Sequence, residues 1–393
     1  MNIAIFTNNY LPNPYGVAAS IESFRKEFEK RGHTVYIFAP RDNGYFSGDE
    51  GISPGRIFFY PAINFKFKGI NFPLVFPYSY RISRILEKME IDVVHSQHPN
   101  LLGWVAAHWA KKKNVPLVFT WHTLYDQYAH FAPAFVPRKF ALWWTLKNAV
   151  SFANKASQVV VPTFSAKKII EKWGVKNKNI VTIPTGILKQ DFSKIDRQLA
   201  RGEHAINEDR IVLGLICRIT KEKNVLFLAK IVALLLQKNE NLVFVLAGDG
   251  DEIATVKRIF AQENIGDRFK YLGVVGGKEK NDFFAMSDIF VYASKSETQG
   301  MVLIEAMQAG LPIVAINATG TCDVVEDGNT GFLVDENEEV FMAAVLKLIE
   351  NKNLRQEFGE KSKMVFAKKY TSSACAYKML EMYQKNIKKE KMS

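Results

Sequence analysis

Two glutamates stand eight positions apart, on either side of a glycine, in the segment S-E-T-Q-G-M-V-L-I-E-A at residues 296–306. A strand-like apolar run precedes the segment and a helical pattern follows. This pattern predicts Glu297 on a turn, Gly300 at a helix start and Glu305 about one and a half turns inside the helix. The amides and dipole of a helix start favour a phosphate, and carboxylates beside it can accept hydrogen bonds from sugar hydroxyls. An ordinary strand–turn–helix with exposed glutamates is the alternative.

An arginine and a lysine, Arg218 and Lys223, follow another strand-like run in the segment C-R-I-T-K-E-K-N. Both are predicted to lie in a loop that is followed by a helix. The planar fork of a guanidinium and the point charge of an ammonium together suit two adjacent phosphates. A surface loop with a salt bridge to Glu222 is the alternative, and the strand-end location favours the phosphate role.

Two strand ends in the first half carry a glycine and a histidine. Gly16 lies between the first strand and the first helix, where the backbone of a doubly wound sheet passes close to a ligand. His122 follows an apolar run, and Tyr125 and Tyr128 lie in the same loop. A lone histidine is more often a structural hydrogen-bonding group than a ligand, but the strand-end position favours a site. The pattern G-x-G-x-x-G is absent, so a dehydrogenase is not favoured, and we expect neither a cofactor nor a metal.

Apolar runs that alternate with helical patterns place these residues on two successive parallel sheets. We predict an α/β protein of two doubly wound Rossmann-like domains facing across a cleft, with ligands at the carboxyl ends of the strands. The predicted organisation is a first domain at 1–190, a linker at 191–210, a second domain at 211–370 and a C-terminal helix at 371–393 that can return to the first domain. The predicted strands are 3–7, 34–39, 92–95, 116–120, 158–162 and 180–183, then 211–216, 242–247, 269–272, 289–292, 312–316 and 331–334.

The composition predicts the compartment in which the protein works and the kind of partner that it meets. The chain has 393 residues, and its three distant cysteines predict neither disulfides nor a metal site, as in a reducing compartment. The N-terminus resembles a strand rather than a signal peptide, and no apolar run is long enough to span a bilayer. Residues 1–196 hold 25 Lys and Arg against 13 Asp and Glu, whereas the remainder holds 27 of each. This asymmetry predicts that the first half meets a polyanion, either nucleic acid or an acidic membrane surface.

The pattern S-E-x-x-G-x-x-x-x-E-A-M-x-x-G-x-P at residues 296–312 resembles retaining glycosyltransferases of family 4, which have the GT-B fold. Arg218 with Lys223, the Gly16 loop and His122 match that family in order and spacing over nearly the whole chain. The resemblance implies that Arg218 and Lys223 stabilise the leaving diphosphate. By the same resemblance Glu297 holds the donor sugar, Glu305 binds the ribose, and His122 lies near the anomeric carbon as a catalytic residue. The implied donor-binding residues are Gly16, Arg218, Lys223, Glu297, Gly300, Met301, Val302 and Glu305. Gln299 and Cys217 depart from the commoner residues of the family without removing a polar group.

Within the family, three segments resemble membrane diacylglycerol glucosyltransferases: residues 10–20, 122–131 and 297–300. The resemblance implies a UDP-glucose donor, a diacylglycerol acceptor and retention of the anomeric configuration. Aromatic residues mixed with cations in the first half suit a lipid headgroup interface, although several must belong to the core. The predicted membrane and acceptor residues are Lys66, Lys68, Arg81, Arg84, Tyr125, Tyr128, Trp143 and Trp144.

Other interpretations stay open at this point. One keeps the family but changes the acceptor to phosphatidylinositol, a glycan or a small soluble sugar acceptor, or changes the nucleotide of the donor. A more distant one is a non-enzymatic protein that binds polyanions, but no RNA- or DNA-binding motif is present. We expect a cytoplasmic enzyme associated peripherally with the cytoplasmic face of the cell membrane, with a UDP-sugar and a lipid as partners and no nucleic acid.

Overall fold

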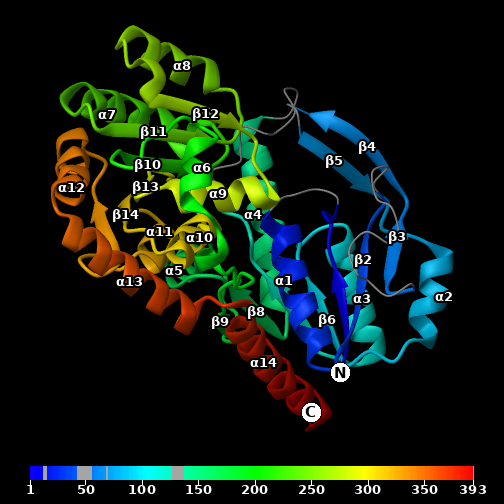
Figure 1. Cartoon of the computed structure of the whole chain (residues 1–393). Coiled ribbons are helices and arrows are strands. Elements are labelled where there is room, and N and C mark those ends of the chain that lie inside the picture. Colours follow the sequence, from blue (N-terminus) through cyan, green and yellow to red (C-terminus); the bar gives the residue numbers. More distant parts are fainter. Residues whose placement is uncertain (12–15, 42–54, 68–69, 126–136, 393) are drawn as a thin grey trace. The chain divides into compact units, whose positions relative to one another are not determined.

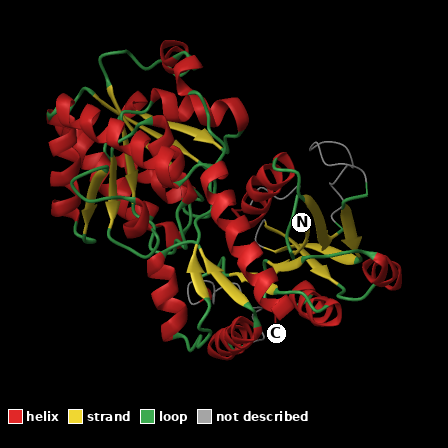
Figure 2. Ribbon diagram, turned by 90° about the horizontal axis from the view of Figure 1, so that it is seen from below, coloured by secondary structure: helices red, strands yellow, loops and turns green. Residues whose placement is uncertain are grey.

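The computed structural model describes residues 1–11, 16–41, 55–67, 70–125 and 137–392, and the chain forms two compact units (Figure 1). The first unit contains Met1–Gly186 and Ser372–Ser393, and the second contains Ile187–Thr371. Each unit is built on one large parallel sheet with helices on both faces (Figure 2). The prediction of two doubly wound α/β units is therefore confirmed.

The sheet of the first unit has seven strands in the order β3-β2-β1-β6-β7-β8-β9, and every pair is parallel. The order turns back at β1, because the chain first adds strands on one side and then crosses to β6 on the other. The crevice beside β1 and β6 at their carboxyl ends is thus the expected ligand position within this unit. The strands are β1 Asn2–Phe6, β2 Thr34–Pro40, β3 Ile57–Tyr60, β6 Val93–Ser96, β7 Leu117–Thr120, β8 Gln158–Val161 and β9 Ile180–Thr182.

Alternating residues of these strands fill two separate cores. Ile3 and Ile5 of β1 pack in one cluster with the first and last helices, whereas Ala4 and Phe6 pack in a cluster on the opposite face. Both faces are apolar because successive side chains of a strand point to opposite sides and helices cover both. The helices are α1 Gly16–Lys30, α2 Tyr80–Lys88, α3 Leu102–Lys113, α4 Arg138–Lys155, α5 Phe164–Lys172 and α14 Ser372–Met392.

A two-stranded antiparallel hairpin, β4 Ala62–Phe67 with β5 Ile70–Val75, stands apart from the large sheet. The sequence analysis predicted neither this hairpin nor β3. Its many Phe and Pro residues, mixed with cations, favour an aromatic surface when only the sequence is considered, and the strand pairing appears only in the folded chain. Pro73, which has no N–H, is tolerated because a two-stranded hairpin has two free edges.

The second unit repeats the plan with six parallel strands in the order β12-β11-β10-β13-β14-β15. The order turns back at β10, which lies between β11 and β13. The strands are β10 Ile211–Ile216, β11 Leu242–Ala247, β12 Phe269–Gly273, β13 Ile289–Tyr292, β14 Ile313–Ile316 and β15 Gly331–Val334. The helices are α6 Arg197–Gly202, α7 Val225–Lys238, α8 Ile253–Gln262, α9 Gly277–Met286, α10 Met301–Ala309, α11 Thr321–Val324, α12 Glu338–Glu350 and α13 Lys352–Lys369.

The predicted linker at 191–210 is wrong, because this stretch is an ordered part of the second unit. It contains α6, and the Arg201 side chain is completely buried. That guanidinium donates to the Met286 carbonyl at 3.0 Å and to the Asp288 carboxylate at 2.7 Å. The polar composition that suggested a linker therefore serves buried charge-assisted hydrogen bonds.

Candidate active site

Three of the charged residues predicted in the second half, Arg218, Lys223 and Glu297, lie around Cys217 on two loops of the second unit. Arg218 and Lys223 come from the loop after β10, and this loop contains a short 3-10 helix, η3 Lys221–Lys223. Glu297 and Gly300 come from the loop after β13, the strand paired with β10. Because the strand order reverses at this pair, the two loops lie at the point where doubly wound sheets bind ligands.

Glu297 is the centre of a compact network. One of its carboxylate oxygens, Oε1, forms an ion pair with the Lys223 ammonium. The same oxygen accepts hydrogen bonds from the Tyr292 hydroxyl at 2.6 Å and the Ser294 hydroxyl at 2.8 Å. Burial on its own raises the pKa of Glu297, but Lys223 and the two hydroxyls outweigh it and hold that pKa below its ordinary value. Glu297 is therefore a fixed anion, suited to accept hydrogen bonds.

Arg218 forms the ion pair with Glu222 that the sequence analysis considered as the alternative, at 3.0 Å. Its side chain is 35% exposed, so part of the guanidinium still faces solvent at the strand end. The ion pair and a phosphate role are compatible, because a guanidinium has five donors. The neighbouring Cys217 is no nucleophile, since burial raises the pKa of its thiol to about 12.

Two glycines that the sequence analysis missed hold the Arg218 loop in place. A Cβ on Gly248 would lie 1.8 Å from the Cys217 carbonyl oxygen, and one on Gly250 would lie 2.2 Å from the Ile219 carbonyl oxygen. Both follow β11 in the segment G-D-G, which the sequence alone presents as an ordinary turn. Any side chain at either position would displace the loop that carries Arg218.

Gly300 lies at the start of α10 in the left-handed region, with φ 75°. A glycine is favoured there because L side chains rarely adopt that conformation. The first amides of α10, from Met301 and Val302, have no partner within a helix and can donate to an anion. Gly320, also missed, allows the loop after β14 to approach, since its Cβ would lie 2.6 Å from the Glu297 carbonyl oxygen.

Glu305 lies in α10 and forms an ion pair with Lys280 of α9 at 2.5 Å. Burial raises the pKa of Glu305, and Lys280 acts against that rise. The sequence analysis identified Glu305 but missed Lys280, because the two are 25 residues apart and no spacing pattern links them. Lys280 therefore helps to position the Glu305 carboxylate.

The first unit presents a different group of residues. His122 follows β7, and its Nε2 lies 2.6 Å from the Gln97 side-chain oxygen at the end of β6. Burial and the neighbouring His98 and His95 lower the pKa of His122 to about 3. The imidazole is therefore neutral at pH 7, with Nε2–H donating to Gln97. His122 can take part in hydrogen bonds, but it does not supply a cation.

A second group of hydrogen bonds lies beside the one between His122 and Gln97. The ring of His95 bridges the Thr120 hydroxyl, 2.7 Å from Nε2, and the Tyr383 hydroxyl, 2.5 Å from Nδ1. His95 lies in β6 and Gln97 directly follows it, while Thr120 ends β7 and His122 follows it, so the two hydrogen-bonded pairs lie at neighbouring strand ends. Tyr383 belongs to α14, so the last helix supports the strand end that carries His122. No sequence pattern predicts the contact between Tyr383 and His95, which are 288 positions apart.

Gly16 is the first residue of α1 in the first unit. A Cβ on Gly16 would meet no atom of the described residues within 4 Å, so packing there does not demand a glycine. The structure thus groups Gly16 and His122 in the first unit and the charged residues in the second.

The residues predicted to meet the membrane or the acceptor lie in different environments in the structure. Trp143 and Trp144 of α4 are 51% and 53% exposed, and the Lys147 ammonium lies 4.7 Å from the Trp143 ring centre. Arg81 and Arg84 are exposed on α2, and Arg84 stacks on Tyr80. Lys66 lies in β4 opposite Asn71, whereas Lys68 and Tyr128 fall outside the described residues.

Tyr125 differs from the prediction of an interfacial residue. Its ring packs against Trp121 at 5.7 Å, at the edge of the apolar core of the first unit. Burial raises the pKa of its hydroxyl. Tyr125 therefore supports the loop after β7 rather than an exposed lipid-binding surface. In the part of the chain that the structure describes, no helix is both long and apolar enough to cross a bilayer.

Comparisons with known proteins agree with this arrangement. Residues 14–188 match the Glycosyltransferase Family 4 model, and residues 196–365 match the model of glycosyl transferases group 1. Since the two models together account for most of the sequence, the chain belongs to the family 4 glycosyltransferases. It is a glycosyltransferase with the GT-B fold, as the resemblance in its motifs implied.

Individual relatives narrow the comparison further. The chain is 29% identical to an alpha-monoglucosyldiacylglycerol synthase of Acholeplasma laidlawii over 99% of both chains. It is 28% identical to a GDP-mannose-dependent alpha-mannosyltransferase of Mycolicibacterium smegmatis over 89% of both. Among solved structures, the Anabaena protein HepE in complex with UDP has a TM-score of 0.78 at 18% identity, covering 98% of this chain and all of that one. That likeness concerns the fold alone.

Proposed function

We propose that this enzyme transfers glucose from UDP-glucose to the free hydroxyl of 1,2-diacylglycerol with retention, giving an α-linked glycolipid. One observation carries the choice of a lipid: the exposed half of α4 presents Phe140, Trp143 and Trp144 to solvent, each more than half exposed. Large aromatic side chains are costly on a water-facing helix but favourable at a headgroup interface. Similarity to two monoglucosyldiacylglycerol synthases, at 29% and 26% identity, supports the same acceptor.

The donor would bind at the crevice of the second unit. The amides at the start of α10 would receive the diphosphate, and Arg218 and Lys223 would neutralise its growing charge. Glu297 would accept hydrogen bonds from the glucose hydroxyls, and Glu305 from the ribose. The HepE structures with UDP and with UDP-glucose support a uridine donor by analogy of fold.

The reaction would need no protein nucleophile. The bond from the anomeric carbon to the diphosphate oxygen breaks, and the acceptor oxygen bonds to that carbon on the same face. The acceptor proton passes to the departing diphosphate. The main tasks of the protein are then to stabilise the charge that develops on the leaving group and to orient the acceptor, with neutral His122 beside the sugar.

The membrane would be reached peripherally, at its cytoplasmic face, through the basic first unit. Partition of the purified protein into vesicles containing anionic lipid should fall about tenfold when Lys66, Lys68, Arg81 and Arg84 are changed together to Gln, and salt should weaken it similarly. Changing the exposed Lys155, Lys172, Lys176 and Lys178 to Gln is the control with the same charge loss. Equal loss in both variants would show that total charge, rather than this surface, governs docking.

A second donor has a specific observation in its favour, namely the likeness to GDP-mannose-dependent mannosyltransferases. A thermal-shift screen with UDP-, GDP- and ADP-sugars separates the two, because only a bound donor raises the unfolding temperature. We expect UDP-glucose to stabilise the protein. Stabilisation by GDP-mannose alone would replace the donor in this proposal while leaving the site residues unchanged.

A further inference from the structure

Glu297 binds its neighbours through only one oxygen of its carboxylate. The Lys223 ammonium and the hydroxyls of Tyr292 and Ser294 all contact Oε1. Among the residues that the structure describes, none forms an ion pair or hydrogen bond with Oε2. The side chain is 14% exposed, and Oε2 is not one of the described buried atoms left without a partner, so solvent can reach it. Since a carboxylate has about four acceptor sites, Oε2 can still accept hydrogen bonds.

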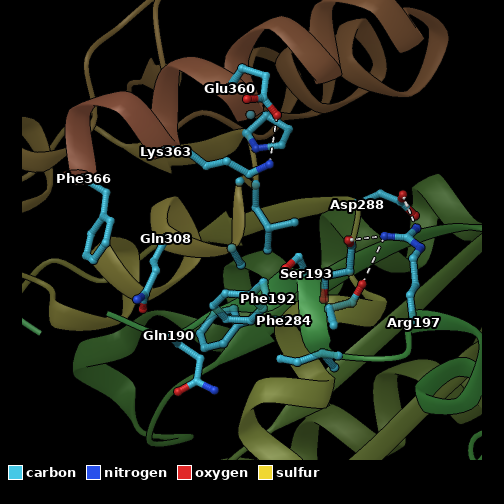
Figure 3. A pocket seen from close by; sticks show the side chains of 18 of the residues that line it. Gln190, Phe192, Ser193, Arg197, Phe284, Asp288, Gln308, Glu360, Lys363 and Phe366 are labelled. Atoms are coloured by element: carbon cyan, nitrogen blue, oxygen red, sulfur yellow. Dashed lines mark hydrogen bonds and ion pairs between the residues drawn. The ribbon is translucent and has the colours of Figure 1, made fainter. Parts of the chain in front are cut away.

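Asp288, at the other end of β13, is bound through both of its oxygens. It directly precedes the strand, whereas Glu297 follows it. Its Oδ1 accepts from Arg197 at 2.6 Å, and its Oδ2 accepts from Arg201 at 2.7 Å and from the Val212 N–H at 2.8 Å. Figure 3 shows Asp288 beside Arg197 in the wall of a cavity of about 710 Å³. The Asp288 side chain is 20% exposed, so greater exposure does not explain why Glu297 uses one oxygen.

The two hydroxyls that hold Oε1 are themselves fixed. Tyr292 ends β13, is 2% exposed, and its ring stacks on Phe290 with the ring centres 6.0 Å apart. Burial and the Glu297 charge raise the pKa of Tyr292 well above its ordinary value, so the hydroxyl keeps the proton that it donates. The Ser294 hydroxyl accepts from the Ser296 N–H at 3.4 Å and donates its own proton to Glu297. Turning either hydroxyl away would leave a buried polar group unpaired.

Lys223 has a second task in the proposed reaction, because its ammonium also meets the diphosphate. An ammonium shared with a phosphate holds a carboxylate less firmly, since the phosphate competes for its charge. The hydroxyls of Tyr292 and Ser294 are neutral and have no such second partner in that reaction. They are therefore the groups that keep the Glu297 carboxylate in place while the donor is bound.

We propose that Oε2 of Glu297 is the atom that accepts a hydrogen bond from the donor sugar, and that Tyr292 and Ser294 are the positioning residues that aim it. This inference rests on the proposed function, in which Glu297 meets the sugar. It adds the oxygen that is used and two residues on which sugar recognition depends. Hydroxyls that only stabilised a buried charge would have no reason to share one oxygen, as the two-sided binding of Asp288 illustrates.

Calorimetric titration of the full-length protein, without acceptor or membrane, tests the proposal. The probes are UDP, UDP-glucose and a set of UDP-glucose analogues that each lack one sugar hydroxyl. We expect UDP-glucose to bind about tenfold tighter than at least one analogue, because a buried charged acceptor is left unpaired without that hydroxyl. Glu297→Ala should bind UDP-glucose and that analogue equally well, which defines the complete loss of the preference.

A double variant then isolates the positioning role. Tyr292→Phe with Ser294→Ala removes only the two hydroxyls, and the tenfold preference should fall to less than about threefold while the affinity for UDP stays the same. The control is Tyr370→Phe with Ser287→Ala. It removes the same two kinds of buried hydroxyl from positions where they donate to backbone carbonyls instead. The control should keep the full preference.

The possible results separate this inference from the proposed function. A full preference in the double variant would overturn the positioning role and leave the contact between Glu297 and the sugar intact. No preference in the unchanged protein, or a preference that Glu297→Ala retains, would overturn the inference together with that contact. Equal loss in the control would assign the effect to general loosening of the unit and contradict the roles of Tyr292 and Ser294. None of these results depends on the acceptor.

Discussion

The two units have similar parallel sheets but differ in the side chains at the carboxyl ends of their strands. These side chains are charged in the second unit and neutral in the first. In the second unit the loops after the strands carry the ion pair of Glu297 with Lys223, and the helices α9 and α10 carry that of Glu305 with Lys280. In the first unit the strand ends carry the neutral imidazoles of His95 and His122, whose pKa values burial lowers to about 3. Six of the seven histidines fall in the first unit. Fixed charge suits a diphosphate, and a neutral polar surface suits sugar and acceptor hydroxyls.

The largest effect that would test this contrast is expected at Lys223. Lys223→Ala should lower kcat about a thousandfold, because it removes the cation that the proposed reaction places beside the leaving group and leaves the Glu297 carboxylate without its ion pair. Initial rates at saturating donor measure it. Lys230→Ala, an exposed lysine of α7, should keep the rate of the unchanged enzyme. A fall in kcat of less than threefold for Lys223→Ala would show that the charge of Lys223 is not needed for the reaction.

His122→Ala should lower kcat about a hundredfold while the affinity for UDP stays the same, because in the proposed reaction the imidazole lies beside the sugar rather than the nucleotide. Steady-state rates and UDP titrations separate the two quantities. His108→Ala, on the exposed side of α3, is the matched control. A change in UDP affinity with unaltered kcat would reverse the roles that we give to the two units.

The contrast also predicts where acid acts first. His95 has a pKa near 6.5 when unfolded and about 3 when folded, so its contribution to stability is present above pH 6.5 and is lost as the pH falls towards 3. Between pH 6.5 and 5.5 the buried His95 alone should cost about 1 kcal/mol. His98 and His122 act in the same direction.

Amide hydrogen exchange at pH 7 and pH 5.5, corrected for the intrinsic rates, measures this effect within each unit. We expect protection to fall in β6 and β7 while β10 and β13 keep theirs. Equal loss in both sheets would show that the histidines do not control acid stability.

Glu305→Ala should raise the KM for the donor about tenfold and leave kcat nearly unchanged, since the proposed contact with the ribose would be made equally before and during the reaction. Glu305→Gln keeps the size and one acceptor oxygen and should lie between the two. A fall in kcat without a change in KM would place Glu305 at the reacting atoms instead.

The smallest effect is expected at Tyr383. Tyr383→Phe removes the hydroxyl that holds His95, and kcat should fall about threefold because the strand end bearing His122 is less well fixed. UDP affinity should stay the same. Tyr377→Phe, on an exposed turn of the same helix, is the control and should have no effect. Equal values in both variants would confine α14 to a structural role.

Much of this contrast could be predicted from the sequence because it depends on local patterns. Apolar runs located the strands of both sheets except β3 and the β4–β5 hairpin, and strand-end positions identified Arg218, Lys223, Glu297 and His122. These features can be predicted because each depends on residues that are neighbours in the sequence. The polar stretch 191–210 misled the same reasoning, since Arg201 is buried through contacts with residues more than eighty positions away.

The supporting residues could not be predicted for the same physical reason. Lys280 meets Glu305, Gly320 meets the Glu297 turn, and Tyr383 meets His95 only after the chain has folded. Each is an ordinary lysine, glycine or tyrosine in its local sequence. Similarly, whether an aromatic residue is core or surface depends on packing, which separates Tyr125 from Trp143.

The proposed reaction is tested most directly by incubating the purified protein with radiolabelled UDP-glucose and anionic vesicles that contain 1,2-diacylglycerol. Lipid extraction and NMR of the product identify both the acceptor and the anomeric linkage. Our account predicts a labelled glycolipid with an α-linked glucose on the diacylglycerol hydroxyl. A protein that binds UDP-glucose in the same vesicles yet forms no such lipid, or forms the β-linked one, would contradict it.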